Sequence, residues 1–161
     1  VMRVCDGNDV HLGHHATADG RWRIYAFADN ARPGKDSRLS AWAEWLFSST
    51  DSPIVKYTPE SSDLDSIFDV KVIYQQTHGE VEFGPKIPAI FAPKVGPFQV
   101  TDYEKVYATD PEVDIFETRG IDRNGAVVVV RPDHYVSQVL SLSDVDELAT
   151  FFNGTLHSAP R

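Results

Sequence analysis

The chain has 161 residues, of which 42% are hydrophobic and 24% charged, and its net charge is −9. This length is typical of one domain that buries enough surface to fold without disulfides or metals. The acidic balance, with its Lys and Arg residues scattered, argues against binding nucleic acid or an anionic membrane. The longest apolar run, 126–130, is too short for a membrane helix, and the first residues show no signal-peptide pattern, so we expect neither a membrane span nor a secretory leader. We therefore expect a cytoplasmic globular protein.

Cys5 is the only cysteine in the sequence. A single thiol makes neither an internal disulfide nor the C-x-x-C pair of a thiol oxidoreductase. We interpret Cys5 as an inert thiol rather than a catalytic one.

The first part of the chain predicts a loop and then a strand. Residues 1–20 are polar and His-rich without a sustained period, which is typical of a loop or a short edge strand. Residues 21–28 alternate aromatic and β-branched side chains with arginine, which predicts a strand. Asn, Pro and Gly over 29–35 then predict a loop.

A helix and a second strand follow. Apolar residues at helical spacing predict a helix over 38–49; they are Leu39, Trp42, Ala43 and Leu46. Residues 51–66 are rich in Ser, Asp and Pro and predict a surface connection, and residues 69–75 predict the second strand.

Residues 76–108 form a long excursion that is rich in glycine and proline between Gly79 and Pro97. A short strand over 87–91 is possible within it. A loop of this length in a compact protein is usually functional or part of an interaction surface.

The segment 110–119 has two interpretations. Asp110 could cap a short helix, with Pro111 in its first turn and Gly120 after its end. A strand is the alternative, because Val113, Ile115 and Phe116 are good strand formers.

The last part of the chain predicts a hairpin and a final helix. Four consecutive valines in 126–131 predict a strand buried on both faces, and 135–142 returns as its antiparallel partner. Ser143 and Asp146 then match a capping box, and Asn153-Gly154 would end the helix. The apolar stripe of this helix contains Val145, Leu148, Ala149 and Phe152.

A strand–helix–strand unit followed by a helix, a hairpin and a last helix is the thioredoxin layout. We therefore predict an α/β, thioredoxin-like fold, in which helices cover both faces of a mixed central sheet. Redox chemistry in that layout would lie in the loop after the first strand, here 29–34, which contains no cysteine. Without a thiolate we expect neither thiol–disulfide exchange nor peroxidase chemistry.

No other motif for chemistry emerges. No Gly-x-Gly occurs, so a Rossmann-type FAD or NAD site is not expected, and Gly79, Gly84 and Lys86 match a P-loop poorly. His11, His14 and His15 lie close together but match no standard metal spacing, so we expect hydrogen-bonded or solvated histidines.

Other polar and aromatic candidates have plain structural interpretations. We expect Asp133-His134 to stabilise a turn rather than act as a base. Ordinary solvated charges are expected at Glu44, Asp63, Asp65 and Asp69. Packing, rather than a ligand box, is expected for Trp22, Trp42, Trp45 and Phe47. Trp45 lies beside the helical stripe and is the best candidate for a partner contact.

Several blocks of the sequence resemble the phenol 2-monooxygenase family of flavoprotein hydroxylases. They run in order along the chain: His11–His14 (HLGH), Ala18–Asp29 (ADGRWRIYAFAD), Asp69–Gln76 (DVKVIYQQ), Arg119–Arg123 (RGIDR) and Gly125–Val136 (GAVVVVRPDHYV). Tyr103–Tyr107 (YEKVY) looks most similar to the 3-hydroxybenzoate 4-monooxygenase branch.

The resemblance implies that residues 1–161 are one thioredoxin-like, C-terminal domain of a larger enzyme that hydroxylates a phenolic ring with FAD, NADPH and dioxygen. In that family this domain packs against the preceding FAD-binding and substrate domains and contributes to a homodimer. No catalytic, cofactor-binding or metal-binding motif of the family maps onto this chain. We therefore predict no catalytic, cofactor or metal residues here, and an exposed apolar patch at 76–108 and around Trp45.

Two alternatives remain. A free-standing binding domain that shares only the fold would contain a small-molecule pocket with a few convergent polar groups. A thiol-independent enzyme would use His134 or the histidines of 11–15.

Overall fold

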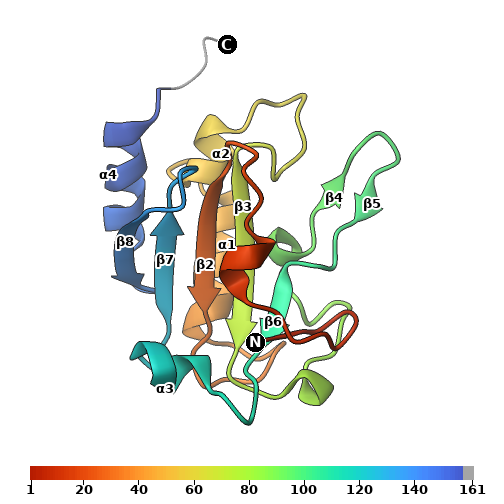
Figure 1. Cartoon of the computed structure of the whole chain (residues 1–161). Coiled ribbons are helices and arrows are strands. Elements are labelled where there is room, and N and C mark those ends of the chain that lie inside the picture. Colours follow the sequence, from red (N-terminus) through yellow and green to blue (C-terminus); the bar gives the residue numbers. More distant parts are fainter. Residues whose placement is uncertain (158–161) are drawn as a thin grey trace.

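Six strands form one mixed sheet that separates two layers of unequal thickness (Figure 1). The computed structural model describes residues 1–157. The strands of the sheet are β1 (Met2–Arg3), β2 (Trp22–Phe27), β3 (Phe68–Tyr74), β6 (Val106–Ala108), β7 (Ala126–Val130) and β8 (Val136–Ser141). A separate hairpin is made by β4 (Lys94–Val95) and β5 (Val100–Thr101). The helices are α1 (Arg38–Ser48), α2 (Pro53–Tyr57), α3 (Ile115–Arg119) and α4 (Val145–Thr155), with 3-10 turns η1 (Leu12–His15), η2 (His78–Glu80) and η3 (Ala89–Phe91).

The order of the strands confirms the predicted fold class. It runs β1-β6-β3-β2-β7-β8, in which β2, β3 and β6 are parallel, and β7 and β8 are antiparallel to their neighbours. The β2–α1–β3 unit thus places its two strands side by side, and the β7–β8 hairpin continues the sheet on the β2 side. A parallel pair joined through a helix and extended by an antiparallel hairpin is the thioredoxin-like arrangement.

Three helices cover one face of the sheet, the helix-covered face. Period-2 alternation directs Ile24 and Ala26 of β2 to this side, where they meet the stripes of α1, α2 and α4. Ser37 caps α1, since its Oγ accepts a hydrogen bond from the backbone N–H of Ser40 (3.0 Å). Every predicted apolar position of α1 is buried.

The 51–66 connection contains a helix that the sequence analysis missed. Ser52 caps α2 and Pro53 occupies its first turn, which is the favoured arrangement at a helix start. Ile54 and Tyr57 are buried against the helix-covered face. A surface connection was therefore the wrong prediction for 52–58.

The other face of the sheet is covered less completely. Figure 1 shows η1, in red, crossing in front of the sheet while α1 lies behind it. The N-terminal segment and the five-residue α3 are the cover, and they pack on Tyr25, Phe27 and Tyr107. The prediction that helices cover both faces holds only weakly on this side, because one short helix spans a small part of it.

The 76–108 excursion is only partly a surface loop. Its end forms β6, a core strand whose three residues are fully buried and pair in parallel with β3. The possible strand over 87–91 is instead the 3-10 turn η3, which buries Ile90 and Phe91. The β4–β5 hairpin extends away from the sheet (Figure 1).

The C-terminal predictions differ from the structure in their boundaries. The helix interpretation of 110–119 holds only for 115–119, because the cap of α3 is Asp114 rather than Asp110 and Pro111 lies outside the helix. Gly120 ends the helix in the left-handed conformation (φ 62°), as predicted. The predicted capping box at Ser143 is wrong, because α4 begins after Asp144, whose carboxylate accepts the Ser141 N–H. The same helix continues through Asn153 and Gly154 to Thr155.

Candidate interaction surface

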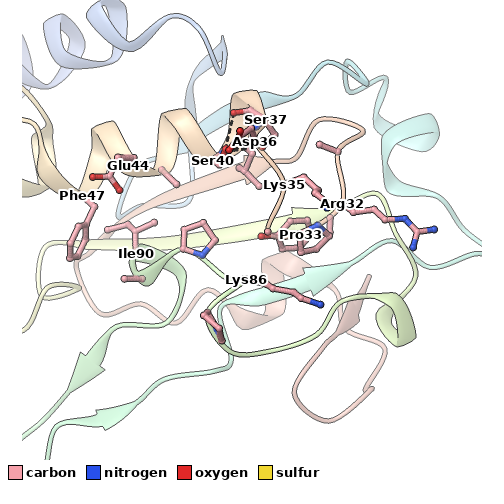
Figure 2. A pocket seen from close by; sticks show the side chains of 18 residues that line it. Arg32, Pro33, Lys35, Asp36, Ser37, Ser40, Glu44, Phe47, Lys86 and Ile90 are labelled. Atoms are coloured by element: carbon pink, nitrogen blue, oxygen red, sulfur yellow. Dashed lines mark hydrogen bonds between the residues drawn. The ribbon is translucent and has the colours of Figure 1, made fainter.

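The loop after β2 occupies the place where this fold would carry redox chemistry, and here it serves as a helix cap (Figure 2). Ser37 and Ser40 form reciprocal hydrogen bonds across the first turn of α1, in which the Ser37 N–H donates to Ser40 Oγ at 2.9 Å. The carboxylate of Asp29 accepts the Arg38 N–H at 2.7 Å. The backbone N–H groups of Arg38 and Ser40, which have no partner within the helix, thus donate to side chains of this loop.

The cations near this loop are also engaged. Arg32 lies 3.4 Å from Glu80, and Lys86 lies 2.5 Å from Glu82. Figure 2 shows the charged ends of Arg32 and Lys86 directed away from the Ser37–Ser40 cap. A cavity of about 320 Å³ lies between these groups. The residues that line this cavity include no thiol and no convergent set of hydrogen-bond donors. Their polar contacts stabilise the conformation of the loop.

Cys5 lies outside this loop, in the N-terminal turn that follows β1. Partial burial and the neighbouring Asp6 raise the pKa of its thiol. A raised pKa lowers the thiolate fraction at neutral pH, which is consistent with the prediction of an inert cysteine.

The histidines singled out by the sequence do not converge on one point. The rings of His11 and His14 lie 4.8 Å apart, while His15 packs edge-on against Tyr107. No group of His, Cys, Asp and Glu side chains within residues 1–157 has the geometry to hold a metal ion. His134 is exposed in the β7–β8 turn at φ 66°, and its neighbour Asp133 pairs with Arg131 at 2.7 Å. Both residues therefore shape this turn, as predicted.

A buried ionic cluster occupies the end of the thinly covered face where β2 and β3 begin. Asp69 is 3% exposed and lies 2.7 Å from the Lys105 ammonium and 2.8 Å from that of Lys71. Arg23 is fully buried beside it and donates to the Thr17 carbonyl in the N-terminal segment. The remaining members of the cluster are Asp19, Arg21, Asp65 and Asp102.

The cluster corrects the prediction of solvated charges at Asp69 and Asp65. Burial alone would raise the pKa of Asp69, but Lys105 and Lys71 hold that pKa below its usual value. Burial lowers the pKa of Lys71, while Asp69 and Asp65 hold the pKa of Lys105 above its usual value. A sequence signal did exist, because strand charges spaced by two residues share a face and the β2–β3 register sets Arg23 beside Asp69. Glu44 is exposed, as expected.

A broad apolar groove lies on the other half of the same face, with a volume of about 990 Å³. Its floor is made by Tyr25 and Phe27 of β2 and by the outward-facing side chains of β7 and β8. We call the latter the β7–β8 face; it consists of Ala126, Val128, Val130, Val136 and Val139. The groove walls are η1 with Val10 and Leu12 on one side, and α3 with Ile115 and Ile121 on the other.

The β7–β8 face is open to solvent although it is apolar. Val136 is 52% exposed, Val139 is 62% exposed, and Val113 at the rim is 59% exposed. The prediction of four buried valines in β7 is therefore only half right, since Val127 and Val129 face the core whereas Val128 and Val130 are half-buried in the groove. Contiguous exposed apolar side chains of this kind mark an interaction surface.

A second exposed apolar site lies on the β4–β5 hairpin. Phe98 at its tip is 88% exposed and Val100 is 63% exposed. Tyr103 at its base packs on Phe83, with ring centroids 5.0 Å apart. The exposed apolar patch expected within 76–108 therefore lies on the β4–β5 hairpin.

The tryptophans pack as predicted, with one difference. Trp22 and Trp42 are buried in the main core. Trp45 is half-buried against that core, and Phe47 is the exposed aromatic residue of α1. The exposed apolar surface of this helix therefore lies at Phe47 rather than at Trp45.

None of the helices within residues 1–157 has the length and apolar character needed to cross a membrane.

Comparison with solved structures found a thioredoxin lipoprotein, Etrx1 of Streptococcus pneumoniae, at TM-score 0.43 and 12% identity, over 94% of this chain and 96% of that one. BsSco, of the Sco family of cytochrome c oxidase assembly proteins, gave a TM-score of 0.44 and 11% identity, over 95% of this chain and 88% of that one.

Among curated proteins, a 3-hydroxybenzoate 4-monooxygenase of Comamonas testosteroni is 46% identical over 98% of this chain. The FAD-dependent monooxygenase terD of Aspergillus terreus is 34% identical over 98% of it, and a phenol 2-monooxygenase, fsqG, of Aspergillus fumigatus is 32% identical over all of it. The matches cover 25%, 28% and 26% of those proteins, so the chain spans about a quarter of their length.

The family model described as the C-terminal dimerisation domain of phenol hydroxylase matches residues 1–160. The match covers nearly the whole chain. The open apolar face and the cysteine-free loop are consistent with a domain of this description. The chain belongs to the phenol hydroxylase C-terminal dimerisation domain family.

Proposed function

We propose that this chain is the dimerisation and interdomain packing module of an FAD-dependent enzyme that hydroxylates a phenolic ring. The observation that carries the proposal is the family match over residues 1–160, combined with monooxygenase relatives about four times as long. In this proposal the chain is one domain, the flavin and the substrate pocket belong to the remainder of the polypeptide, NADPH supplies the electrons, and the enzyme acts in the cytoplasm as a homodimer.

The two exposed apolar sites support a role in association. The β7–β8 face and the β4–β5 hairpin lie on different parts of the molecule (Figure 1). A chain that joins both a second subunit and its own neighbouring domains needs two such surfaces.

The chemistry of the described residues supports a non-catalytic role. The loop after β2 uses its polar groups to cap α1, and the ionic cluster pairs each of its carboxylates with a cation. We propose that the chain contributes no catalytic, cofactor-binding or metal-binding residue.

Truncation of the parent enzyme tests the proposal. A parent lacking residues 1–161 should sediment as a monomer, whereas the complete parent should be a dimer that binds FAD and oxidises NADPH in the presence of a phenol. The isolated chain should neither bind FAD nor turn over a phenol. A truncated parent that remained dimeric, or an isolated chain that bound flavin, would contradict the proposal.

The groove favours a second candidate, a free-standing domain that binds a small apolar ligand. Its volume of about 990 Å³ reaches the range of ligand sites, and Arg119, His11 and His134 lie at its margin. Screening the isolated chain against aromatic acids and fatty acids by calorimetry tests this candidate. Saturable binding that a Phe27→Trp substitution abolishes would favour it over the dimerisation module.

A further inference from the structure

The β7–β8 face is the one apolar part of the described sheet that carries no covering helix. Across the sheet, the side chains of Val127, Val129 and Leu140 are buried under helices. On the open side, Val136 and Val139 remain more than half exposed. Alternate side chains of the β7–β8 hairpin therefore point into the buried core on one face and into solvent on the other, although both sets are apolar.

The free edge of the sheet beside this face lacks the usual protection against a partner. No strand pairs with β8 on its outer side within residues 1–157. The stretch 135–143 contains neither a charged residue nor a proline, the two devices that commonly prevent approach to an edge. A second body can therefore approach the face from the β8 side without burying a charge.

The family match to a dimerisation domain points to a second copy as this body, and the charge distribution is compatible with one. The chain carries a net charge of −9, so most of its surface repels a second copy at neutral pH. Among the side chains that line the groove, only Arg119 and Asp122 carry full charges, and these cancel. Contact through the groove therefore places no cluster of like charges of the two copies face to face.

We propose that two copies of this chain associate across a two-fold axis by packing their β7–β8 faces against each other. Val136 and Val139 of one copy enter the groove of the other, between η1 and α3, and the same contact is repeated by symmetry. The contact resembles sheet-on-sheet packing, in which alternate side chains of two strand faces interdigitate. This inference rests on the proposed function and names the surface that carries it out.

The β4–β5 hairpin takes no part in this contact. Figure 1 shows the β4–β5 hairpin, a separate two-stranded sheet that carries the exposed Phe98 and Val100, on the side of the molecule away from β8. The hairpin is left for other contacts, so it provides a control with an exposed apolar side chain outside the proposed contact.

Sedimentation of the isolated chain and three variants tests the proposal. Val139→Asp places an unpaired carboxylate in the apolar groove of the partner and should raise the dimer dissociation constant at least about 100-fold. Val55→Asp, on the exposed side of α2, and Phe98→Asp, at the hairpin tip, should leave that constant unchanged. Circular dichroism and the unfolding midpoint check that each variant is folded.

A second measurement avoids substitutions. Methyl NMR spectra of the unmodified, valine-labelled chain should show the Val136 and Val139 signals shifting with protein concentration, while the Val55 signal stays fixed. Monomeric behaviour at all concentrations, a dimeric Val139→Asp variant, or loss of the dimer in Phe98→Asp would each overturn the proposal. If the complete parent needs this chain to dimerise but tolerates Val139→Asp, the proposed function stands and this inference fails.

Discussion

The two faces of the sheet are built from the same strands but are completed in different ways. On the helix-covered face, α1, α2 and α4 bury the alternate side chains of β2, β3 and β7. On the other face, the N-terminal segment and α3 cover an ionic cluster and part of an aromatic cluster, and the β7–β8 half is left open. Both faces are apolar along β7, so hydrophobicity alone does not tell which one holds the monomer together.

This difference between the two faces predicts which residues stabilise the folded monomer and which contribute to association. A residue on the helix-covered face should contribute to the free energy of unfolding, whereas a residue on the β7–β8 face should contribute to binding. The ionic cluster lies between these extremes, because it is buried but made of charges whose desolvation offsets most of their attraction.

The largest expected effect is at the centre of the helix-covered face. Phe68 is fully buried, and its ring meets that of Phe152 at 5.1 Å. Phe68→Ala should lower the free energy of unfolding by about 3–5 kcal/mol, because it removes a large side chain and leaves a cavity. Urea denaturation followed by tryptophan fluorescence measures the loss. A loss below about 1 kcal/mol would mean that this face is not the folding core.

Breaking the ionic cluster should cost nearly as much. Asp69→Asn leaves Lys71 and Lys105 buried without their main counter-ion, and we expect a loss of about 3 kcal/mol. The control is Asp133→Asn, which breaks the exposed pair with Arg131 and should change stability by less than about 1 kcal/mol. Equal effects of the two substitutions in denaturant titrations would show that burial of the cluster does not matter.

The same cluster predicts how stability depends on pH. The pKa of Asp69 in the folded chain lies below its unfolded value of 3.8, so the folded state holds this carboxylate in its charged form. Its contribution is fully present above pH 3.8 and is lost as the pH falls through the lower, folded pKa. Acid titration of the unfolding midpoint should show this loss in the native chain and a shallower slope in Asp69→Asn. An identical slope in both proteins would exclude Asp69 as the source.

Gly125 tests the junction between β2 and the hairpin. It has φ 95°, and an added Cβ would lie 3.0 Å from the Phe27 carbonyl oxygen and collide with the Leu142 side chain. Gly125→Ala should therefore cost about 1–3 kcal/mol. Gly20→Ala is the control, since φ is 81° there but no atom lies within 4 Å of the new Cβ. Thermal unfolding should rank Gly125→Ala as the less stable of the two, and the reverse order would contradict the described packing.

The smallest expected effect is on the open face. Val139→Thr retains the β-branched shape at a site that is 62% exposed, so the unfolding free energy of the monomer should change by no more than about 0.5 kcal/mol. Val129→Thr buries the same hydroxyl on the helix-covered face and should cost about 1–3 kcal/mol. Denaturation at a concentration where the chain is monomeric gives both values. Similar costs would remove the distinction between the two faces.

Much of the fold follows from local patterns in the sequence. The alternation in 21–28, the helical stripe around Trp42 and the valine run at 126–131 each predict an element that the structure contains. These signals are strong because one side of each element is buried continuously. The missed α2 is short and begins in a Ser- and Pro-rich segment, where cap residues resemble those of a turn.

The thinly covered face of the sheet, with its ionic cluster and its groove, was harder to predict because it depends on pairing between distant segments. β6 is three residues long, and its preceding Lys105 is a charged residue that tertiary contacts bury. Asp69 resembles a solvated charge until the strand register places it beside Arg23 and Lys105. Val128 and Val129 look alike in sequence, and only the cover on each face of the sheet distinguishes them.

The lack of charge on the β7–β8 face has a thermal consequence. Contacts between aliphatic side chains are driven mainly by water release near room temperature, and this driving force weakens on cooling. Salt has few attractive charge pairs to weaken, because Arg119 and Asp122 are the only charged side chains along the groove, and it screens the repulsion between two copies that each carry a net charge of −9. An assembly held by this surface should thus tolerate salt yet dissociate more readily in the cold.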